Sequence, residues 1–587
     1  MPVELDRLRV LVVCCLALAG CESAPIVADA GRGDAGPRDS GPPDAGDPPL
    51  VPDQVCPGSE GCMDGTPGTL RVGAARQEIT PDPSAAEQLT VDVDGNGEWN
   101  PEDGDVFDDR DGDGVFDAVW MAGFGTGRAA TGVSDPQYAT AVVLENGETS
   151  IAFVSIDCVG YFVTEMDRVR ALVSGLAIDY VVVSATHVHE ARDTVGIWGA
   201  TLADSGYDEA YMTLVAERAA AAVREAHAAL TAAHVEYSSF FLRDVDDPLR
   251  WVGDNRDPFV MDDELRMMRF VRADGDATLA TMINYAAHPE YGGSRNTLLS
   301  SDYVHWLRDG IERGADGPTP ADRREGVGGI TLFVNGALGV QIGPNRVHIE
   351  RWDGTPVSDD SLAASQVVGE QLAWHALGAL TGGGVISEET AALAFRRARF
   401  LVKIENTRYH IAFQQGLFRR EVVNYDPTRP IRAGMNIPDT ETEIALIDVG
   451  LATMLSIPGE LDPVLFVGGY DGAFTPEGTA VVDTTRENPP DLAMAPEGPY
   501  LRDLLAARRG FTVAEDGVRV EGGQVWLLGL TNDFLGYFLP SFDYELDRGL
   551  PYIGEAPGAH YEETNSIGPL GWPRVEGKIH ELISWTP

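Results

Sequence analysis

Short apolar runs alternate along the chain with amphipathic stretches, which predicts both strands and helices. Short β-rich runs begin near Leu70, and the clearest are Ile151 to Ile156 and Tyr180 to Ser184. The stretch from Tyr207 to Leu230 instead places alanines and apolar residues three and four positions apart, as one face of a helix requires. Strands that alternate with amphipathic helical segments are typical of an α/β domain. We therefore expect an α/β domain over residues 69–587.

The first residues of the chain indicate export. Two arginines precede an apolar run at residues 10–19, which is too short to span a bilayer but suits the core of a signal peptide. The run ends in Leu18-Ala19-Gly20-Cys21, which resembles a bacterial lipobox, so residues 1–21 read as a lipoprotein signal peptide with a lipid-bearing cysteine. An ordinary cleaved signal with an incidental cysteine is the alternative. Because residue 22 is glutamate, and not the aspartate that commonly retains lipoproteins at the inner membrane, we expect an exported, lipid-anchored protein of the bacterial outer membrane.

The next segment, residues 22–68, is rich in Ala, Asp, Gly and Pro and lacks apolar periodicity. Such a segment cannot bury enough apolar surface to fold, so we expect a disordered acidic stalk between the lipid anchor and the domain. No later apolar stretch is long enough for a membrane helix, which predicts a tethered and not a spanning protein.

The overall charge excludes one class of partner. The chain has 43 basic and 92 acidic residues, a formal net charge of -49 at pH 7. A surface this acidic repels a phosphate backbone, so nucleic acid is not an expected partner. The charge suits an extracellular protein that tolerates salt or binds calcium, and compositional drift would produce the same balance.

The six cysteines divide between the export signal and the domain. Cys14, Cys15 and Cys21 belong to the signal and its lipid site. Cys56 and Cys62 flank a short Pro-Gly loop in an oxidising compartment, which favours a disulfide between them. Cys158 follows an apolar strand and is expected to be a buried free thiol without a catalytic role.

Acidic residues between positions 92 and 117 are spaced like the ligands of calcium loops. Oxygen-bearing side chains at alternate positions let one turn of chain wrap a hard cation, and a glycine permits the sharp bend. The first run holds Asp92, Asp94, Asn96, Glu98 and Asp103, and the second holds Asp109, Asp111, Asp113 and Asp117. Clear flanking helices are absent, and Trp120 stands at the twelfth position of the second run. We expect a structural, calcium-loop-like insert, with a merely solvated acidic loop as the alternative.

Three histidines lie just past apolar, strand-like runs. His187 and His189 belong to Thr186-His187-Val188-His189, which follows Tyr180-Val181-Val182-Val183 almost directly. If the chain is still extended there, the two side chains point to the same side and could face one metal ion. His288 follows the run Met282-Ile283-Asn284-Tyr285. Two strands that each end near a histidine suggest a shared edge of the sheet.

Several short motifs follow one another in an order that belongs to a known family. They are Arg71-Val72-Gly73 leading to Ile79-Thr80-Pro81, Met121-Ala122-Gly123-Phe124-Gly125, Ser184-Ala185-Thr186-His187-Val188-His189, His288-Pro289, Ser301-Asp302-Tyr303, Pro458-Gly459-Glu460, Asn532 through Tyr537, and Tyr561-Glu562. This series resembles the motifs of the neutral, non-lysosomal ceramidases. Each motif is short, but the shared order is hard to obtain by chance. The resemblance covers residues 70–585 and implies a mixed sheet with flanking helices.

The resemblance also implies a zinc site and its ligands. In that family one zinc is bound by the first histidine of a His-x-His pair, a later histidine, the glutamate after Pro-Gly, and a tyrosine. By position these residues are His187, His288, Glu460 and Tyr537, and their nitrogen and oxygen atoms suit zinc. The other carried-over candidates are His189 for proton transfer, Tyr561 for steadying an oxyanion or merely for packing, and Asn335 for a polar contact.

The chain departs from the family at the nucleophile. The family's serine lies in a motif similar to Asn335-Gly336-Ala337-Leu338-Gly339, where its position falls on Gly339. A glycine cannot attack a carbonyl, so either a zinc-bound water is the nucleophile, since zinc lowers the pKa of water to about 7, or amide cleavage has been lost. The family's arginine near the site matches Arg256 or Arg243, and the separate C-terminal β-domain of typical ceramidases is expected to be absent.

We accordingly predict a ceramidase-like zinc hydrolase that cleaves an amide or ester bond of a small molecule or lipid by metal-activated water. One alternative is a genuine ceramidase acting on N-acyl sphingosine, through water or through another serine such as Ser300 or Ser301. The other is a non-catalytic surface protein whose structural metal has a closed shell of protein ligands.

Overall fold

The computed structural model describes residues 49–586 apart from 344, 359 and 433. Its largest element is a mixed sheet of nine strands. The strand order is β15 (Ile330–Asn335), β11 (Thr278–Tyr285), β10 (Glu264–Arg272), β9 (Thr231–Phe241), β2 (Arg71–Glu78), β6 (Tyr138–Glu145), β7 (Ser150–Ile156) and β8 (Tyr180–Ala185), with β16 (Ile386–Glu388) paired to β9. The β15–β11 and β7–β8 pairs are parallel, and the other pairs are antiparallel.

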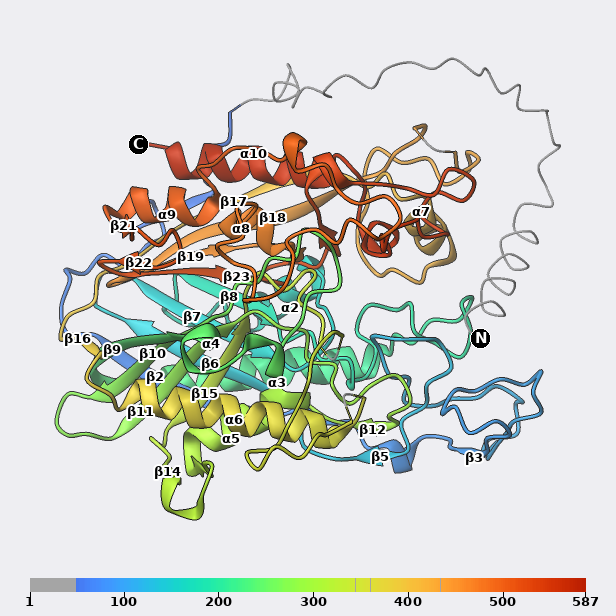
Figure 1. Cartoon of the computed structure of the whole chain (residues 1–587), viewed down its shortest axis with the longest axis horizontal. Coiled ribbons are helices and arrows are strands. Elements are labelled where there is room, and N and C mark those ends of the chain that lie inside the picture. Colours follow the sequence, from blue (N-terminus) through green and yellow to red (C-terminus); the bar gives the residue numbers. More distant parts are fainter. Residues whose placement is uncertain (1–48, 344, 359, 433, 587) are drawn as a thin grey trace.

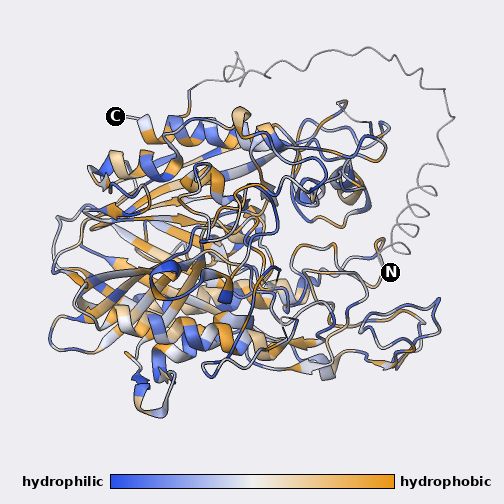
Figure 2. Ribbon diagram, in the orientation of Figure 1, coloured by the Kyte–Doolittle hydropathy of each residue, from blue (hydrophilic) through white to orange (hydrophobic). Residues whose placement is uncertain are grey.

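A second sheet of five strands covers one face of the first. Its order is β1 (Gln54–Cys56), β17 (Leu393–Lys403), β18 (Asp439–Val449), β19 (Ala452–Ser456) and β23 (Gln524–Leu528). The two sheets share one core, to which Phe153, Met268 and Met282 contribute from the larger sheet and Phe395 and Trp526 from the smaller. The strands of both sheets are largely hydrophobic in Figure 2, as expected of sheets with two covered faces.

Helices cover the outer faces of both sheets, which gives four layers (Figure 1). α2 (Val163–Val173) and α3 (Glu209–Ala228) pack on β2, β6, β7 and β8, while α5 (Asp302–Arg313) and α6 (Leu362–Leu380) pack on β10, β11 and β15. α8 (Pro463–Val467), α9 (Leu501–Arg509) and α10 (Gly571–Ser584) share the core beneath the five-stranded sheet. The sequence of α3 explains why a helix forms and packs there. Asp208 caps its first turn by accepting from Tyr211 N, and its buried face is mostly alanine and valine.

The remaining elements of the described chain are short and lie in connecting segments. The helices are α4 (Leu242–Val245) and α7 (Thr407–Gln415). The two-stranded pairs are β3 (Leu89–Val91) with β4 (Val106–Phe107), β5 (Gly132–Val133) with β12 (Leu298–Leu299), β13 (Gly314–Ala315) with β14 (Arg324–Glu325), β20 (Glu460–Leu461) with β24 (Tyr537–Phe538), and β21 (Thr512–Val513) with β22 (Val520–Glu521). Single 3-10 turns lie at η1 (Pro83–Ala85), η2 (Pro248–Arg250), η3 (Pro320–Asp322), η4 (Leu492–Met494), η5 (Ser541–Asp543) and η6 (Glu562–Asn565).

The nine-stranded sheet curls so that its two edge strands approach each other. β15 and β8 stand at opposite ends of the strand order, yet they are in contact. Ser155 Oγ of β7 donates to Phe333 O of β15 over 2.6 Å. Asn335 Nδ2, at the end of β15, donates to Thr186 O just past β8. The curl therefore brings the segment after β8 next to the segments after β11 and β15. The segment after β8 carries His187 and His189, and the segment after β11 carries His288.

The structure confirms the mixed α/β architecture and the strands and helix that the sequence predicts most clearly. It also confirms the Cys56–Cys62 disulfide and the buried free thiol of Cys158. The expectation that a disordered stalk continues to residue 68 is wrong for its last part, because β1 pairs with β17 in the register Gln54↔Arg397. The predicted signal peptide and the predicted stalk up to residue 48 lie outside the described residues.

After Tyr561 the described chain forms η6 and then α10, which packs on β17. Of the helices that the structure describes, none is both long and apolar enough to cross a bilayer.

Candidate active site

His187 reaches the site through a turn in the backbone. β8 ends at Ala185, and His187 has a φ of 66°, in the left-handed region that residues other than glycine rarely adopt. The chain is therefore not extended at this point, which was the condition for His187 and His189 to point to the same side. The ring is held by a hydrogen bond of 2.5 Å from Nδ1 to Val159 O, which leaves Nε2 facing Glu460 Oε2 at 3.2 Å.

His288 presents the same nitrogen from the other side of the site. It follows β11, and its Nδ1 donates to Gln341 O over 3.2 Å. Its Nε2 lies 3.1 Å from Glu460 Oε2. A histidine whose Nδ1 is bound to a backbone carbonyl has its free Nε2 oriented for a metal ion.

A parallel pair of short strands aligns the two oxygen ligands. β20 and β24 place Glu460 directly opposite Tyr537. Tyr537 OH lies 3.4 Å from His288 Nε2, and both Glu460 and Tyr537 are buried. The structure thus brings together the four residues that the sequence predicts as zinc ligands. Two imidazole nitrogens, a carboxylate and a phenol form a donor set that fits zinc.

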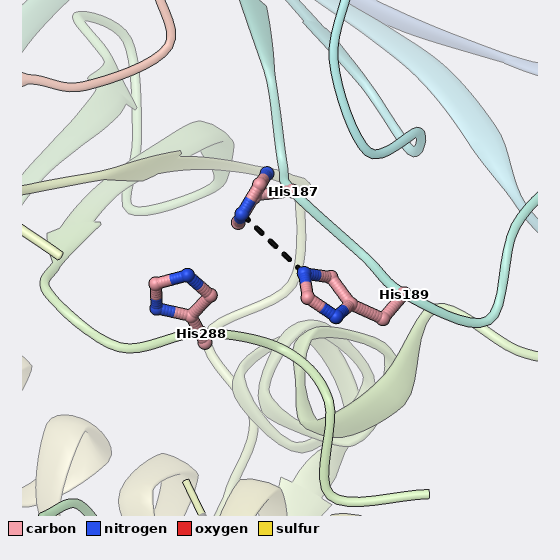
Figure 3. A group of neighbouring side chains, drawn as sticks. All are labelled: His187, His189 and His288. Carbon is pink, nitrogen blue, oxygen red and sulfur yellow. Dashed lines mark hydrogen bonds between the residues drawn. The ribbon is translucent and has the colours of Figure 1, made fainter. Parts of the chain in front are cut away.

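His189 joins this cluster, as Figure 3 shows. Its Nε2 lies 3.4 Å from His187 Nε2, and ligand atoms of His187, His189 and His288 all lie within 4.8 Å of one another. On the opposite side of its ring, Nδ1 lies 3.0 Å from Glu290 Oε2. The three histidines could therefore hold a metal ion, and Glu290 stands directly behind one of them.

Burial and mutual contact set the charges of the site. Burial disfavours the carboxylate of Glu460, but His187 and His288 outweigh it and lower the pKa of Glu460. Burial likewise disfavours a charged His187, but the nearby Glu460 outweighs burial, so the pKa of His187 lies above its usual value. Burial, with repulsion from His187 and His288, lowers the pKa of His189 well below its usual value, while burial raises the pKa of Glu290 to about 7. An ionised carboxylate among imidazoles suits a bound cation.

The cluster opens into a cavity of about 720 Å³. Tyr561 lines this cavity beside Tyr537, with the two hydroxyl oxygens 3.0 Å apart. Burial, and then the charge of Glu562, raise the pKa of Tyr561 well above its usual value, so that its hydroxyl stays protonated and can donate. The apolar part of the wall consists of Phe124, Val159, Phe162, Val195, Ile197, Trp198, Leu202, Ile342, Ile404, Phe413, Phe418, Phe534, Leu535 and Ile567.

Other predicted residues lie away from the cavity wall. Asn335 is fully buried and supports the backbone just before His187 through its bond to Thr186 O. Ser300 and Ser301 are fully buried too, and their hydroxyls donate to Asp135 and Asp157 respectively. Neither serine is placed to act as a nucleophile in this cavity.

The two candidate arginines are both engaged in ion pairs. Arg243 pairs with Asp263 at 2.6 Å. Arg256 is buried among Asp543, Glu562 and Glu563, at 2.9, 3.4 and 2.9 Å. Because Glu562 follows Tyr561 directly, Arg256 supports the segment that carries this tyrosine.

Gly339 does not face the cavity. A Cβ at this position would lie 2.7 Å from Leu461 C and 2.8 Å from Glu460 O, and Gly339 N donates to Leu461 O over 2.9 Å. The same loop turns Ile342 and Asn345 to the cavity wall. Position 339 is therefore a place of close approach between this loop and β20.

Sequence reasoning missed Glu290, which lines the cavity next to His189. The available signal was its position two residues after His288, the same spacing that separates His187 from His189. In the absence of a fold, that spacing does not distinguish a residue of the site from a solvated glutamate.

The two acidic loops adopt matching conformations. Asp92 accepts from Gly95 N and Gly97 N, and Asp109 accepts in the same way from Gly112 N and Gly114 N. In the second loop, oxygens of Asp111, Asp113 and Asp117 lie within 4.8 Å of one another, as do those of Glu87, Asp109 and Asp111. Glu87 is a residue that the spacing pattern did not include. In the first loop, Asp94 accepts from Asn96 N, Asn96 from Glu98 N, and Asp103 from the Asn100 side chain.

Taken together, the fold and the cluster define a four-layer α/β protein with a candidate metal site at the end of a curled sheet. No family model and no curated protein matches the sequence. Among solved structures, the chain matches a neutral ceramidase from Pseudomonas aeruginosa with a TM-score of 0.52 and 14% identity, over 88% of this chain and 73% of that chain. It also matches a ceramidase complexed with C2, with a TM-score of 0.52 and 14% identity over 88% of this chain and 74% of that chain. The chain thus has the fold of the neutral ceramidases.

Proposed function

We propose that the protein is a zinc-dependent hydrolase of an amide or ester bond. The observation that carries the proposal is the convergence of His187 Nε2, His288 Nε2, Glu460 Oε2 and Tyr537 OH beside one cavity. Four separate segments of the chain contribute these atoms. His187, Glu460 and Tyr537 also line the cavity, which a purely structural metal site would not need.

Zinc bound by these four residues would polarise a carbonyl group and lower the pKa of a water molecule. The chain's own residues would supply the remaining chemistry. His189 Nε2 points to the same place and would take and return a proton. The Tyr561 hydroxyl, which stays protonated, would donate to the oxygen of the carbonyl as negative charge develops there.

The cavity wall favours a substrate with a long apolar chain. Most of its surface is formed by aromatic and aliphatic side chains, among them Phe162, Phe413, Phe418 and Trp198. An acyl chain buried there would gain about 0.8 kcal/mol for each methylene group. A lipid amide or lipid ester is therefore the substrate class that the cavity fits.

The first test is the metal content of the purified protein by mass spectrometry. One zinc per chain is expected in the native protein, and close to none in His187→Ala and His288→Ala. His348→Ala is the matched control, because its side chain is 49% exposed and pairs with Asp247 at 3.6 Å. A native protein without zinc contradicts the proposal.

A screen of amide and ester substrates then separates the alternatives. Cleavage of N-acyl sphingosine identifies a genuine ceramidase, whereas cleavage of simpler acyl amides or esters alone supports the broader hydrolase. Zinc that is present without any hydrolysis supports the non-catalytic surface protein. The open cavity at the cluster favours an enzyme over that third reading.

The proposal includes the cellular setting and a second metal. The lipobox-like sequence supports export and lipid anchoring, which would keep the enzyme near membrane lipids. The clustered carboxylates of the second acidic loop support a structural calcium ion there. Burial, and then repulsion from Asp113 and Glu87, raise the pKa of Asp117, and a bound cation would relieve that repulsion.

A further inference from the structure

Glu290 stands beside the histidine that the proposed function uses to move a proton. Its Oε2 lies 3.0 Å from His189 Nδ1, and the two residues are only 5% and 7% exposed. Its other oxygen, Oε1, has no hydrogen-bond partner among the described residues. A buried carboxylate is costly unless it is paired, so its place against one imidazole calls for a reason.

The three histidines of the site differ in what holds Nδ1. Backbone carbonyls hold His187 and His288, at 2.5 and 3.2 Å. At Nδ1, His189 alone among the three faces a carboxylate, whereas His187 and His288 face Glu460 through Nε2. A carbonyl is enough to orient a ring that binds a metal ion, whereas a carboxylate also stabilises a ring that takes up positive charge. The Nδ1 partner of His189 therefore suits proton transfer, whereas the Nδ1 partners of His187 and His288 suit metal binding.

The surroundings of His189 fix its ring from both sides. A Cβ at Gly123 would lie 2.4 Å from His189 Cγ, so only glycine allows the loop to pack against the ring. Phe124 meets the ring edge-on with centroids 5.1 Å apart. The Nδ1–H direction is not yet aligned with Oε2, and such catalytic contacts commonly align only when substrate is in place.

We propose that Glu290 is a positioning residue for His189, which keeps the ring proton on Nδ1 and Nε2 free to accept a proton. The inference rests on the proposed function. Nε2 accepts a proton from the attacking water as the water oxygen bonds to the carbonyl carbon. The bond from that carbon to the leaving nitrogen or oxygen then breaks, and the proton passes from Nε2 to the leaving atom. Glu290 itself forms no bond to the substrate.

The test compares Glu290→Gln and Glu290→Asp with the native full chain in three measurements. Metal content is expected to stay at one zinc per chain in both variants. On a cleaved acyl amide, Glu290→Gln is expected to lower kcat by about 100-fold with KM changed less than about threefold, since general acid–base catalysis contributes about 10²–10⁴. Glu290→Asp is expected to recover part of this loss. Glu209→Gln is the matched control and should keep the native kcat, because Glu209 of α3 is 67% exposed and pairs with Arg168 at 3.0 Å outside the cavity wall.

Nitrogen NMR of the His189 imidazole provides a readout that does not depend on hydrolysis. We expect the Nδ1–H tautomer in the native chain and a shift towards the Nε2–H tautomer in Glu290→Gln. The same tautomer in both proteins, or an unchanged kcat in Glu290→Gln, overturns the inference. Loss of zinc in Glu290→Gln also overturns it, because Glu290 would then act through the metal. A native chain without zinc or hydrolysis refutes the proposed function, and the tautomer measurement still decides the role of Glu290.

Discussion

Replacing Glu443 by glutamine should destabilise the protein, because this residue joins the two sheets through a buried ion cluster. Glu443 lies on β18 and its side chain is fully buried. It accepts from Arg170 of α2 at 2.8 and 3.1 Å, from Arg399 at 2.8 Å, from Arg397 at 3.3 Å and from Tyr180 of β8 at 2.8 Å. The substitution keeps the size of the side chain and removes its charge.

The magnitude follows from the guanidinium groups that would lose their carboxylate. Breaking a buried ion pair by removing one partner costs about 3–5 kcal/mol. Glutamine keeps one acceptor oxygen, so we expect a loss near the lower end, about 3 kcal/mol. Glu441→Gln is the matched control on the same strand. Glu441 is 54% exposed and pairs with Arg399 at 3.2 Å, so its loss should cost less than about 1 kcal/mol.

The pH dependence gives a second check on the same variant. Burial opposes ionisation of Glu443, but Arg170, Arg399 and Arg397 outweigh it and lower its pKa below the usual 4.5. A carboxylate with a lowered folded-state pKa contributes stability above its unfolded pKa and loses it as the pH falls through the folded value. The stability gap between native protein and Glu443→Gln should therefore be full at pH 7 and shrink below pH 4.5.

Equilibrium urea unfolding, followed by tryptophan fluorescence at pH 7 and at acidic pH, measures both effects. Equal midpoints for Glu443→Gln and Glu441→Gln at pH 7 would refute the view that this cluster stabilises the sheet interface. A gap that stays constant or widens on acidification would refute the charge-based explanation.

Two further predictions concern the cavity and the acidic loops. Ile197→Asp should raise KM for a long-chain substrate about tenfold, by removing contacts with about two methylene groups. Ile197→Leu should change KM little, and so should Ile197→Asp when the substrate has a short chain. Equal effects on both chain lengths would exclude Ile197 from the acyl site. Removing calcium with a chelator should lower the thermal midpoint of unfolding, since a ligand at about 100 times its Kd contributes about 2.7 kcal/mol. Asp109→Asn should abolish this shift. Asp276→Asn, on an exposed turn, should keep it.

The parts of the fold that follow from local pattern could be predicted, and the parts that depend on distant contacts could not. The apolar run of β7 and the helical spacing of α3 are properties of short segments, and both elements are present. β1 was missed because its three residues gain their place by pairing with β17, more than 300 residues later. The residues around β1 do not indicate that β17 is its partner.

The candidate site shows the same division. The resemblance to ceramidases named His187, His288, Glu460 and Tyr537, and the structure brings all four together. It does so through the curl of the nine-stranded sheet and the left-handed turn at His187, neither of which is specified by local sequence. Glu290 could not be assigned without that arrangement, because nothing local links it to His189.

Gly339 shows how the same residue can be interpreted in two ways, and a serine placed there distinguishes them. The family motif has a serine nucleophile at this position, so by that comparison Gly339→Ser should restore a nucleophile. In the structure a Cβ at 339 meets backbone atoms of β20 at 2.7–2.8 Å, and β20 carries Glu460. We therefore expect Gly339→Ser to lose about 1–3 kcal/mol through overpacking, to bind zinc less well and to remain unlabelled by a fluorophosphonate. Gly383→Ser is the control, since a Cβ there meets nothing within 4 Å. Fluorophosphonate labelling together with increased hydrolysis in Gly339→Ser would show instead that position 339 faces the substrate.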